Sequence, residues 1–430
     1  MKPTRSILAL ALLASTSTMA AEPGVVSPNQ PEPAAMAGWN DMIDGLRDLP
    51  TQMLARLPEA QRNDPQIQQE IGRLALEAIA SSALEAIGDD GDHPIFLPGP
   101  TQVLDIGQPN ADTTYRVAAL TPGATYRLRG RRGSVRMARI AEAGPRATKQ
   151  ETGKVNLGTP RPVHDINALH VDARGRFDVI LSPTRPAGYT GDWWQSLPDS
   201  NMLLVRFVSS DWGKEVDPTI AIERLDKPVT RPRPTAAELQ QRLRSMLEKT
   251  QFIAPLFVGQ AAYLRQQGYL NRLKASDFSH QGGLAGQFYY EGAYEVQDDE
   301  ALILEVKPPA RCIYSSIILT DDIYETTDWV NNHSSLNDSQ YRADKDGVLR
   351  FVVSSRDPGV PNWLDTAGYP SGVIQGRWTE CDSQPVPSVR KVAFADVRKS
   401  LPADTAAVTP AQREQQLRNR RAAFLQRPLW

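Results

Sequence analysis

Cysteine is scarce in this chain, since Cys312 and Cys381 are the only two among 430 residues. Two thiols cannot build a multi-cysteine metal cluster. The G-x-S-x-G, G-x-x-x-x-G-K-[ST] and H-E-x-x-H motifs are absent as well, so the sequence indicates no hydrolase elbow, phosphate-binding loop or zinc-protease helix. His164 and His170 lie six residues apart but lack a third ligand nearby, which is typical of surface or packing residues. We therefore expect no metal and no cofactor.

A surplus of either charge is absent too, with 48 Lys plus Arg against 50 Asp plus Glu. This balance does not fit a general polyanion binder, so we expect no nucleic-acid partner. No apolar run reaches the roughly 20 residues that span a bilayer, so we expect no membrane-spanning segment.

The first 20 residues have the pattern of a secretory signal peptide. Basic Lys2 and Arg5 precede an apolar run, 6–14, and Thr18 and Ala20 occupy the −3 and −1 positions of a cleavage site. The sequence thus predicts a cleaved signal peptide and a periplasmic or secreted protein. Export in turn favours a disulfide between the two cysteines, because oxidising compartments preserve such bonds. Two buried free thiols are the alternative.

The pattern of the remaining chain changes from helical to strand-like spacing twice. Short period-two segments separated by Gly and Pro turns predict antiparallel β structure, and no βαβ alternation appears. The predicted fold is mainly β with helical segments: an N-terminal β-rich domain and a C-terminal jelly-roll-like antiparallel β-sandwich, with helices before each and at the C-terminus. No solenoid repeat is visible, although two β bodies that each follow helices indicate a loose duplication. The predicted segments are a signal peptide 1–20, a flexible leader 21–35, a helical segment 36–90, the β-rich domain 91–226, a Pro-rich linker 227–235, a second helical segment 236–272, the sandwich 273–400 and a basic C-terminal helix 401–430.

The C-terminal helix is rich in arginine. We expect it to be a solvated helix on the surface, with an anionic partner as the alternative. Thr409 and Gln412 have the spacing of a helix capping box, with Pro410 at the first helical position.

Four runs combine tryptophan or tyrosine with Asn or Asp, and three of them are 356–368, 324–340 and 110–115. A tryptophan ring offers a flat apolar face and the neighbouring amides and carboxylates offer directional hydrogen bonds, which suits a glycan or a planar organic ligand. The alternative is that Asn and Asp satisfy loop backbones while the tryptophans close the ends of a sandwich. A fourth such run is Gly191–Trp194. The candidate ligand-binding residues are Asn110, Asp112, Tyr115, Tyr324, Trp329, Asn337, Gln340, Asn362, Trp363 and Asp365.

For an enzyme, the candidate acid–base groups are Asp112, Asp365, His333 and Tyr324. Burial beside tryptophan raises the pKa of a carboxyl, as a general acid requires, and a pair of carboxylates would suit glycoside chemistry. Nothing in the sequence shows that Asp112 and Asp365 are close together.

At these motifs the chain resembles a bacterial family, domain of unknown function 1214. The matching pieces include DEALILEV (299–306), the series from Tyr324 to Gln340, VVSSRDPGVPNWLDTAGYPSG (352–372), YRLRGRRGSV (126–135) and GDWW (191–194). NADTTYRVA (110–118) is similar to a piece of the companion domain of unknown function 1254. The resemblance covers about residues 95–385. It implies a β-rich domain followed by a jelly-roll-like sandwich, but no settled activity.

Three functions fit these features. The first is an exported protein that binds a glycan or hydrophobic small molecule in an aromatic, Asn- and Asp-lined cleft between the two β domains. The second is an uncharacterised hydrolase- or lyase-like enzyme that uses the same cleft. The third is a structural or homo-oligomeric envelope component, in which the aromatic residues form core or interface.

Overall fold

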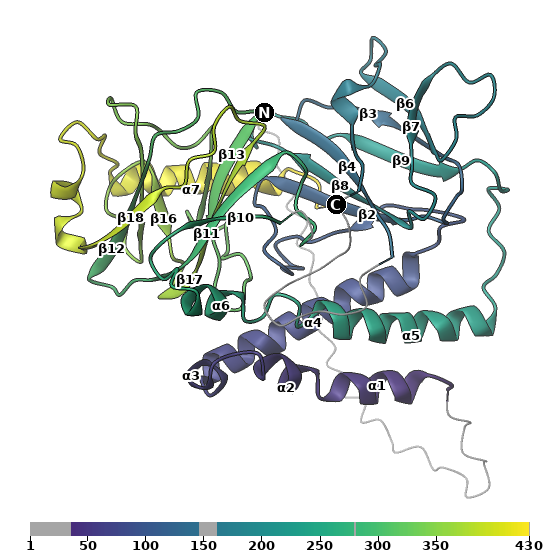
Figure 1. Ribbon diagram of the computed structural model, residues 1–430, viewed down its shortest axis with the longest axis horizontal. Helices are drawn as coiled ribbons and strands as arrows, with labels where there is room; N and C mark the ends of the chain where they lie inside the picture. Colours follow the sequence, from purple (N-terminus) through teal and green to yellow (C-terminus); the bar gives the residue numbers. More distant parts are fainter. Residues whose placement is uncertain (1–35, 146–160, 279–280, 430) are drawn as a thin grey trace, which may run out of the picture.

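The computed structural model describes residues 36–145, 161–278 and 281–429. The predicted signal peptide and leader, 1–35, lie outside these ranges. The described chain forms two β-sandwiches side by side, with a layer of helices beneath them (Figure 1). The predicted mainly β, two-domain sandwich fold is therefore confirmed.

The first sandwich has a five-stranded sheet facing a four-stranded one. Apolar residues alternate along the strands and meet in one core around Leu128, Ile140 and Phe207. The five-stranded sheet has the order β1 (Leu97–Pro98), β2 (Thr113–Ala119), β8 (Met202–Val208), β4 (Met137–Ala143), β5 (Val163–Asp165), and the four-stranded sheet the order β7 (Asp192–Gln195), β6 (Arg176–Ser182), β3 (Tyr126–Arg131), β9 (Thr219–Arg224).

The second sandwich is built in the same way around Tyr294, Leu304 and Phe351. Its five-stranded sheet has the order β10 (Lys274–Ser276), β11 (Gln287–Glu295), β17 (Ser371–Thr379), β13 (Tyr314–Leu319), β14 (Ser335–Asn337), and its four-stranded sheet the order β16 (Trp363–Asp365), β15 (Leu349–Ser354), β12 (Glu300–Val306), β18 (Ser388–Ala393). Cys312 and Cys381 form a disulfide at the end of the β13–β17 pair, as predicted, with 4.1 Å between their Cα atoms.

The two sandwiches have the same topology. Each strand of the first sandwich corresponds to the strand numbered nine higher in the second sandwich, so β1 corresponds to β10 and β9 to β18. With this correspondence, the strand orders of both sheets are identical. Each four-stranded sheet even carries its parallel pair at the same place, β6–β7 and β15–β16. The loose duplication indicated by the sequence is thus a complete repeat of the strand arrangement.

Local contacts repeat as well. In the β6–β7 pair, Trp193 lies opposite the residue two positions before Ser182. In the β15–β16 pair, Trp363 lies opposite the residue two positions before Ser354. Each indole nitrogen donates to the hydroxyl of its serine, at 3.0 and 3.1 Å. Each serine hydroxyl in turn donates to the carbonyl two residues further on, at 2.8 Å. The tryptophans of GDWW and PNWLD therefore fix equivalent strand edges.

The helical layer contains α1 (Trp39–Arg47), α2 (Leu49–Leu54), α3 (Glu59–Arg62), α4 (Pro65–Gly88), α5 (Ala236–Ile253) and α6 (Gln260–Gln266). Asp64 caps α4, and Thr235 with Glu238 forms the capping box of α5. One apolar cluster joins α2 and α4 to the chain after α5 and to Ile323 of the second sandwich. The helices thereby tie the two β bodies together from below.

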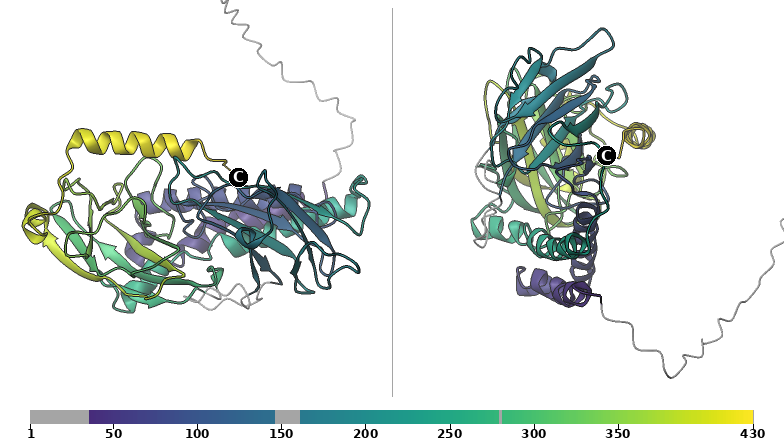
Figure 2. Two further views of the ribbon diagram at one scale, coloured as in Figure 1. Left: turned by 90° about the horizontal axis from the view of Figure 1, so that it is seen from above. Right: turned by 90° about the vertical axis from the view of Figure 1, so that its right-hand side faces the viewer.

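The last helix, α7 (Pro410–Leu425), begins at the predicted capping box. It lies across one face of the second sandwich and directs the chain end toward the first (Figure 2). The expectation of a solvated basic helix is wrong for its inner face, because Arg413 and Arg420 are buried. Their guanidinium groups are satisfied by protein acceptors, which is what burial of an arginine requires.

Two details of the strands could not be predicted. Strand β4 starts at Met137 rather than nearer the turn at Gly133, because the Ser134 amide bonds to the carbonyl of Val216. The sheets are antiparallel, as predicted, except for the short parallel pairs β6–β7 and β15–β16. No helix in the described ranges has the length and apolar character needed to cross a membrane.

Candidate functional site

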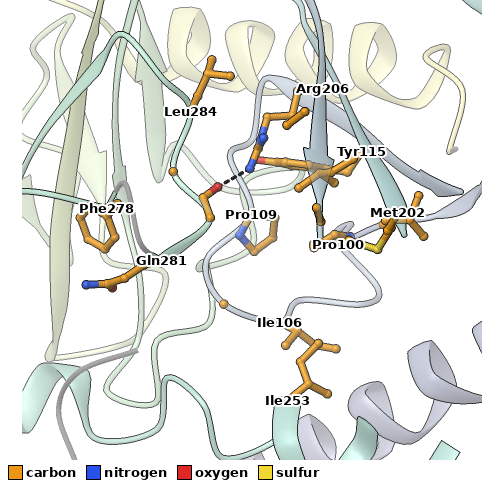
Figure 3. A pocket seen from close by; sticks show the side chains of 18 of the residues that line it. Pro100, Ile106, Pro109, Tyr115, Met202, Arg206, Ile253, Phe278, Gln281 and Leu284 are labelled. Atoms are coloured by element: carbon orange, nitrogen blue, oxygen red, sulfur yellow. Dashed lines mark hydrogen bonds between the residues drawn. The ribbon is translucent and has the colours of Figure 1, made fainter. Parts of the chain in front are cut away.

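A cavity of about 850 Å³ lies between the two sandwiches and the helical layer. Its sides come from β2, β4 and β8 of the first sandwich and from β11 and β17 of the second, and α5 forms its floor (Figure 3). The loops 104–110 and 281–285 complete it. The five-stranded sheets of the two repeats thus contribute opposing walls of one site.

Most of the wall is apolar. Side chains of this kind come from both sandwiches and from the end of α5, and the main ones are Leu104, Ile106, Val117, Met202, Leu204, Ile253, Leu256, Phe257, Phe278 and Leu284. A cavity of this size with a mostly apolar wall has the character of a small-molecule site.

One pair of polar side chains on each sheet wall follows the repeat. On the first sheet Tyr115 pairs with Arg206 across β2 and β8. On the second, Tyr289 pairs with Arg377 across β11 and β17. These two pairs occupy equivalent positions in the repeats. Each arginine lies two residues before the end of its strand ladder, which is Val208 in β8 and Thr379 in β17. All four side chains border the cavity.

The two arginines differ in their partners. The Arg206 guanidinium donates to the carbonyl of Gly282, which belongs to the loop before β11 (Figure 3). Arg377 is only 4% exposed, and its Nη1 has no hydrogen-bond partner among the described residues. Its guanidinium carbon lies 5.7 Å from the centre of the Tyr289 ring, at cation–π distance.

Two further polar groups stand out. Gln108, at a left-handed φ of 60°, borders the cavity, and its buried Nε2 has no hydrogen-bond partner in the described part of the chain. Lys249 of α5 is in ion-pair contact with Glu85 of α4 at the floor. Burial lowers the pKa of Lys249 to about 8.

Three of the predicted site residues border this cavity: Asn110, Tyr115 and Tyr324. The Tyr115 hydroxyl accepts a hydrogen bond from the backbone N–H of Asn110 at 3.2 Å. The Tyr324 hydroxyl donates to Glu291 and accepts from Gln375, and burial raises its pKa well above the ordinary value of 10.0. Of the four acid–base candidates, Tyr324 is the one that borders the main cavity.

Asp112 is instead the centre of a buried joint between the sandwiches. Its carboxylate accepts hydrogen bonds from Trp212 at 2.9 Å, from Asn337 at 2.7 Å and from the Tyr314 hydroxyl at 2.5 Å. Burial raises the pKa of Asp112, and the bonds from Tyr314 and Asn337 oppose that shift. Trp329 packs nearby, in one cluster with Trp212. These residues border neither the cavity between the sandwiches nor a second cavity beneath α7.

A second cavity of about 780 Å³ lies beneath α7 and is bordered by His333, Gln340 and Asn362. The Asn362 amide is occupied by backbone groups of Arg342 and Arg350. His333 donates from Nδ1 to the Trp363 carbonyl, and burial with the nearby arginines lowers its pKa to about 3.

Trp363 and Asp365 belong to β16 rather than to either cavity. Burial raises the pKa of Asp365, whose carboxylate caps the amide of Ala367. The ten predicted ligand-binding residues are therefore divided between the main cavity, the cavity under α7 and buried joints. Asp112 and Asp365 share neither cavity.

No group of three or more His, Cys, Asp or Glu side chains within the described ranges could hold a metal ion. His164 bonds to Glu142 at 2.7 Å and stacks on Trp194. It therefore has the packing role that its sequence context indicates.

The fold and the cavity define a class of protein: a tandem β-sandwich with a pocket between its two repeats. No family model and no curated protein matches the chain. Among solved structures it is similar to an uncharacterised protein from Burkholderia cenocepacia, at 28% identity and a TM-score of 0.75, over 84% of this chain and 98% of that one. The VPA0106 protein from Vibrio parahaemolyticus aligns over 82% of this chain and 100% of that one, at 12% identity and a TM-score of only 0.43.

Proposed function

We propose that this protein is exported and binds a hydrophobic small molecule in the cavity between its two sandwiches. One observation carries the proposal: about 850 Å³ of space is bordered by apolar side chains from both repeats and from α5. Ligand pockets commonly have this volume and lining and commonly lie where two domains meet.

The chemistry of the wall favours a hydrophobic ligand over a glycan. The Trp, Asn and Asp side chains that would have suited a sugar are mostly engaged with the protein, as Asp112 and Asn362 illustrate. Aliphatic and phenylalanine side chains dominate the remaining wall. Such a surface gains free energy by covering apolar ligand area rather than by binding hydroxyl groups.

Export is supported by the Cys312–Cys381 disulfide, since such bonds are typical of oxidising compartments. The signal-peptide pattern of residues 1–20 points the same way. The resemblance to domain of unknown function 1214 stays a prediction.

The test is binding of a neutral fluorescent probe, N-phenyl-1-naphthylamine, to protein extracted with solvent to remove any bound lipid. We expect saturable enhancement of its fluorescence. Leu204→Trp should weaken binding at least about tenfold, because the larger ring would occupy the cavity from the middle of β8.

Val229→Trp is the matched control. It adds the same ring at a position that is 82% exposed in the segment between the two halves. Binding should survive this change. Absence of saturable binding to the unaltered protein, or equal binding by both tryptophan variants, would contradict the proposal.

A further inference from the structure

Arg377 is an unusual residue for an apolar cavity. Its guanidinium is buried at the β11–β17 wall, its Nη1 has no acceptor, and no ion pair joins it to a carboxylate within the described ranges. Leaving a buried charge without a partner is costly. The protein also holds the group in place, by cross-strand pairing with Tyr289 and by contact with its ring. A fixed, uncompensated guanidinium is a receptor for an anion.

The repeat supplies a second cation on the opposing wall. Arg206 occupies the position equivalent to Arg377, and it too has no carboxylate partner in the described part of the chain. Among the described residues, its guanidinium donates to a backbone carbonyl, that of Gly282. Each arginine has a tyrosine beside it, Tyr115 or Tyr289.

The acidic groups of the cavity do not neutralise these arginines. Glu142 accepts hydrogen bonds from His164, Ser200 and the Leu197 amide. The remaining acidic lining residues lie at the floor of the cavity. They are Glu85 of α4, Asp89 just after α4, and Glu248 of α5. Of these, Glu85 is taken by Lys249. Within the described ranges, Arg206 and Arg377 are therefore the sheet-wall cations of the cavity that no carboxylate pairs, since Arg161 pairs with Asp199.

Figure 3 shows how the two kinds of lining are separated. Arg206 and Tyr115 lie together on the sheet wall, whereas Ile106 and Ile253 lie together toward α5. An occupant with an acidic group at one end and an apolar body would match both regions at once.

We propose that the ligand is an amphipathic anion, whose acidic group is bound by Arg377 with Arg206 as a second donor, and whose apolar body packs against the aliphatic wall. This inference rests on the proposed function and specifies the chemistry of its ligand. Carboxylate and phosphate heads share the required chemistry, since both accept paired hydrogen bonds from a guanidinium.

The test compares two probes of the same skeleton, neutral N-phenyl-1-naphthylamine and anionic 8-anilinonaphthalene-1-sulfonate, in fluorescence titrations. The sulfonate should bind about tenfold more tightly than the neutral probe, as expected for hydrogen bonds to a charged group. In Arg377→Met this preference should disappear while neutral-probe affinity stays within about twofold. Arg206→Met should reduce the preference in part.

Arg174→Met is the matched control, because it removes the same charge from an exposed turn of the first sandwich outside the cavity. It should leave the preference intact, which separates local binding from the overall field. If Arg377→Met does not fold, Arg377→Lys keeps the charge and should retain most of the preference.

A charge series on the unaltered protein needs no variant. Dodecanoate and dodecyl phosphate should displace the sulfonate probe at least about tenfold better than dodecan-1-ol, and the better of the two identifies the head group. Equal displacement by the alcohol would overturn the inference while leaving the proposed function standing. Failure of every probe, neutral and charged, would instead remove the proposed function itself.

Discussion

At the scale of single residues, the buried polar groups of this protein have two separate tasks. Asp112 has its acceptors filled by Trp212, Tyr314 and Asn337, and so it joins the sandwiches. Within the described ranges Arg377 has a buried donor without a partner, and the residue borders open space. Asp112 therefore has a structural task, whereas an unfilled guanidinium beside open space leaves room for a ligand.

A third buried group predicts a pH effect on stability. Glu325 lies under Arg73 of α4, with Asp321, Glu77 and Asp105 close enough to affect its charge. Burial, and next the charge of Asp321, raise the pKa of Glu325 far above its ordinary value of 4.5. Folding therefore favours the protonated acid. Its stabilising contribution is complete below about pH 4.5 and is lost as the pH rises through neutrality toward the raised pKa.

Glu325→Gln should remove this dependence, because the amide keeps the shape but cannot ionise. The fall in melting temperature between pH 5 and pH 8.5 should be smaller in the variant, and at pH 8.5 the variant should melt higher than the unaltered protein. Thermal denaturation followed by circular dichroism measures both. Glu414→Gln on α7, where the side chain is 58% exposed, is the control and should change neither. If the melting temperatures of the two variants fall equally between pH 5 and pH 8.5, Glu325 ionises freely and this prediction is wrong.

The sequence could identify residue types but not their partners. The runs around Asp112, Trp329 and Asn362 combine tyrosine or tryptophan with Asn and Asp, as a sugar site would. A buried joint uses the same groups for the same hydrogen bonds. Arg206 and Arg377 had a weaker signal, a cation inside the apolar strands MLLVRFV and SGVIQGRWT. That they border one cavity depends on strand register across two domains, which no local pattern contains.

At the scale of elements, α7 connects the two halves more than its basic composition indicates. Arg413 bonds to Asp357 of the second sandwich, and Phe424 packs against Trp212 of the first. Arg427, just after the helix, bonds to Asp217 and to the backbone of Asp112. The helix therefore fastens the outside of the joint whose inside is Asp112.

Arg420→Met should loosen this helix. The buried Arg420 guanidinium donates to the Trp329 carbonyl, to Gln340 and to Ser335, and lies 4.4 Å from the Trp212 ring centre. Its loss leaves these acceptors unpaired and should cost about 2–3 kcal/mol of docking free energy. Hydrogen exchange should become faster throughout 410–425. Arg418→Met, at a side chain that is 71% exposed, is the control. Equal exchange in the two variants would contradict the role given to Arg420.

Long elements were predictable and short ones were not. The capping box of Thr409 and Gln412 locates the start of α7, because such a signal is local, and α4 and α5 fall inside the segments predicted to be helical. Strands β7 and β16 have four and three residues, and each is held by a parallel pairing with a strand before it. Such segments adopt strand geometry because a neighbour offers an edge, and their own residues carry little sign of it.

At the scale of the whole molecule, duplication explains why the cavity has two similar walls. The same strand order occurs twice, so the same sheet surface occurs twice, and the two surfaces contribute opposing walls with their Tyr–Arg pairs. Met137 and Tyr314 occupy equivalent positions and belong to one apolar cluster, which marks where the repeats meet. The site therefore exists only while both sandwiches are folded and joined.

This dependence predicts that the sandwiches unfold together, and the disulfide offers a way to test it. Cys312–Cys381 lies within the second sandwich, and removing a bridge with a sequence separation of 69 residues should cost roughly 4 kcal/mol. In the Cys312→Ser/Cys381→Ser variant, the slowest exchange in β6 of the first sandwich should rise by the same factor as that in β15 of the second, because the Asp112 joint, the helical layer and α7 couple the halves. Hydrogen exchange with mass spectrometry resolves the two strands. Faster exchange in β15 alone would mean that the halves open independently, and a ligand held between them could then leave without unfolding of the first sandwich.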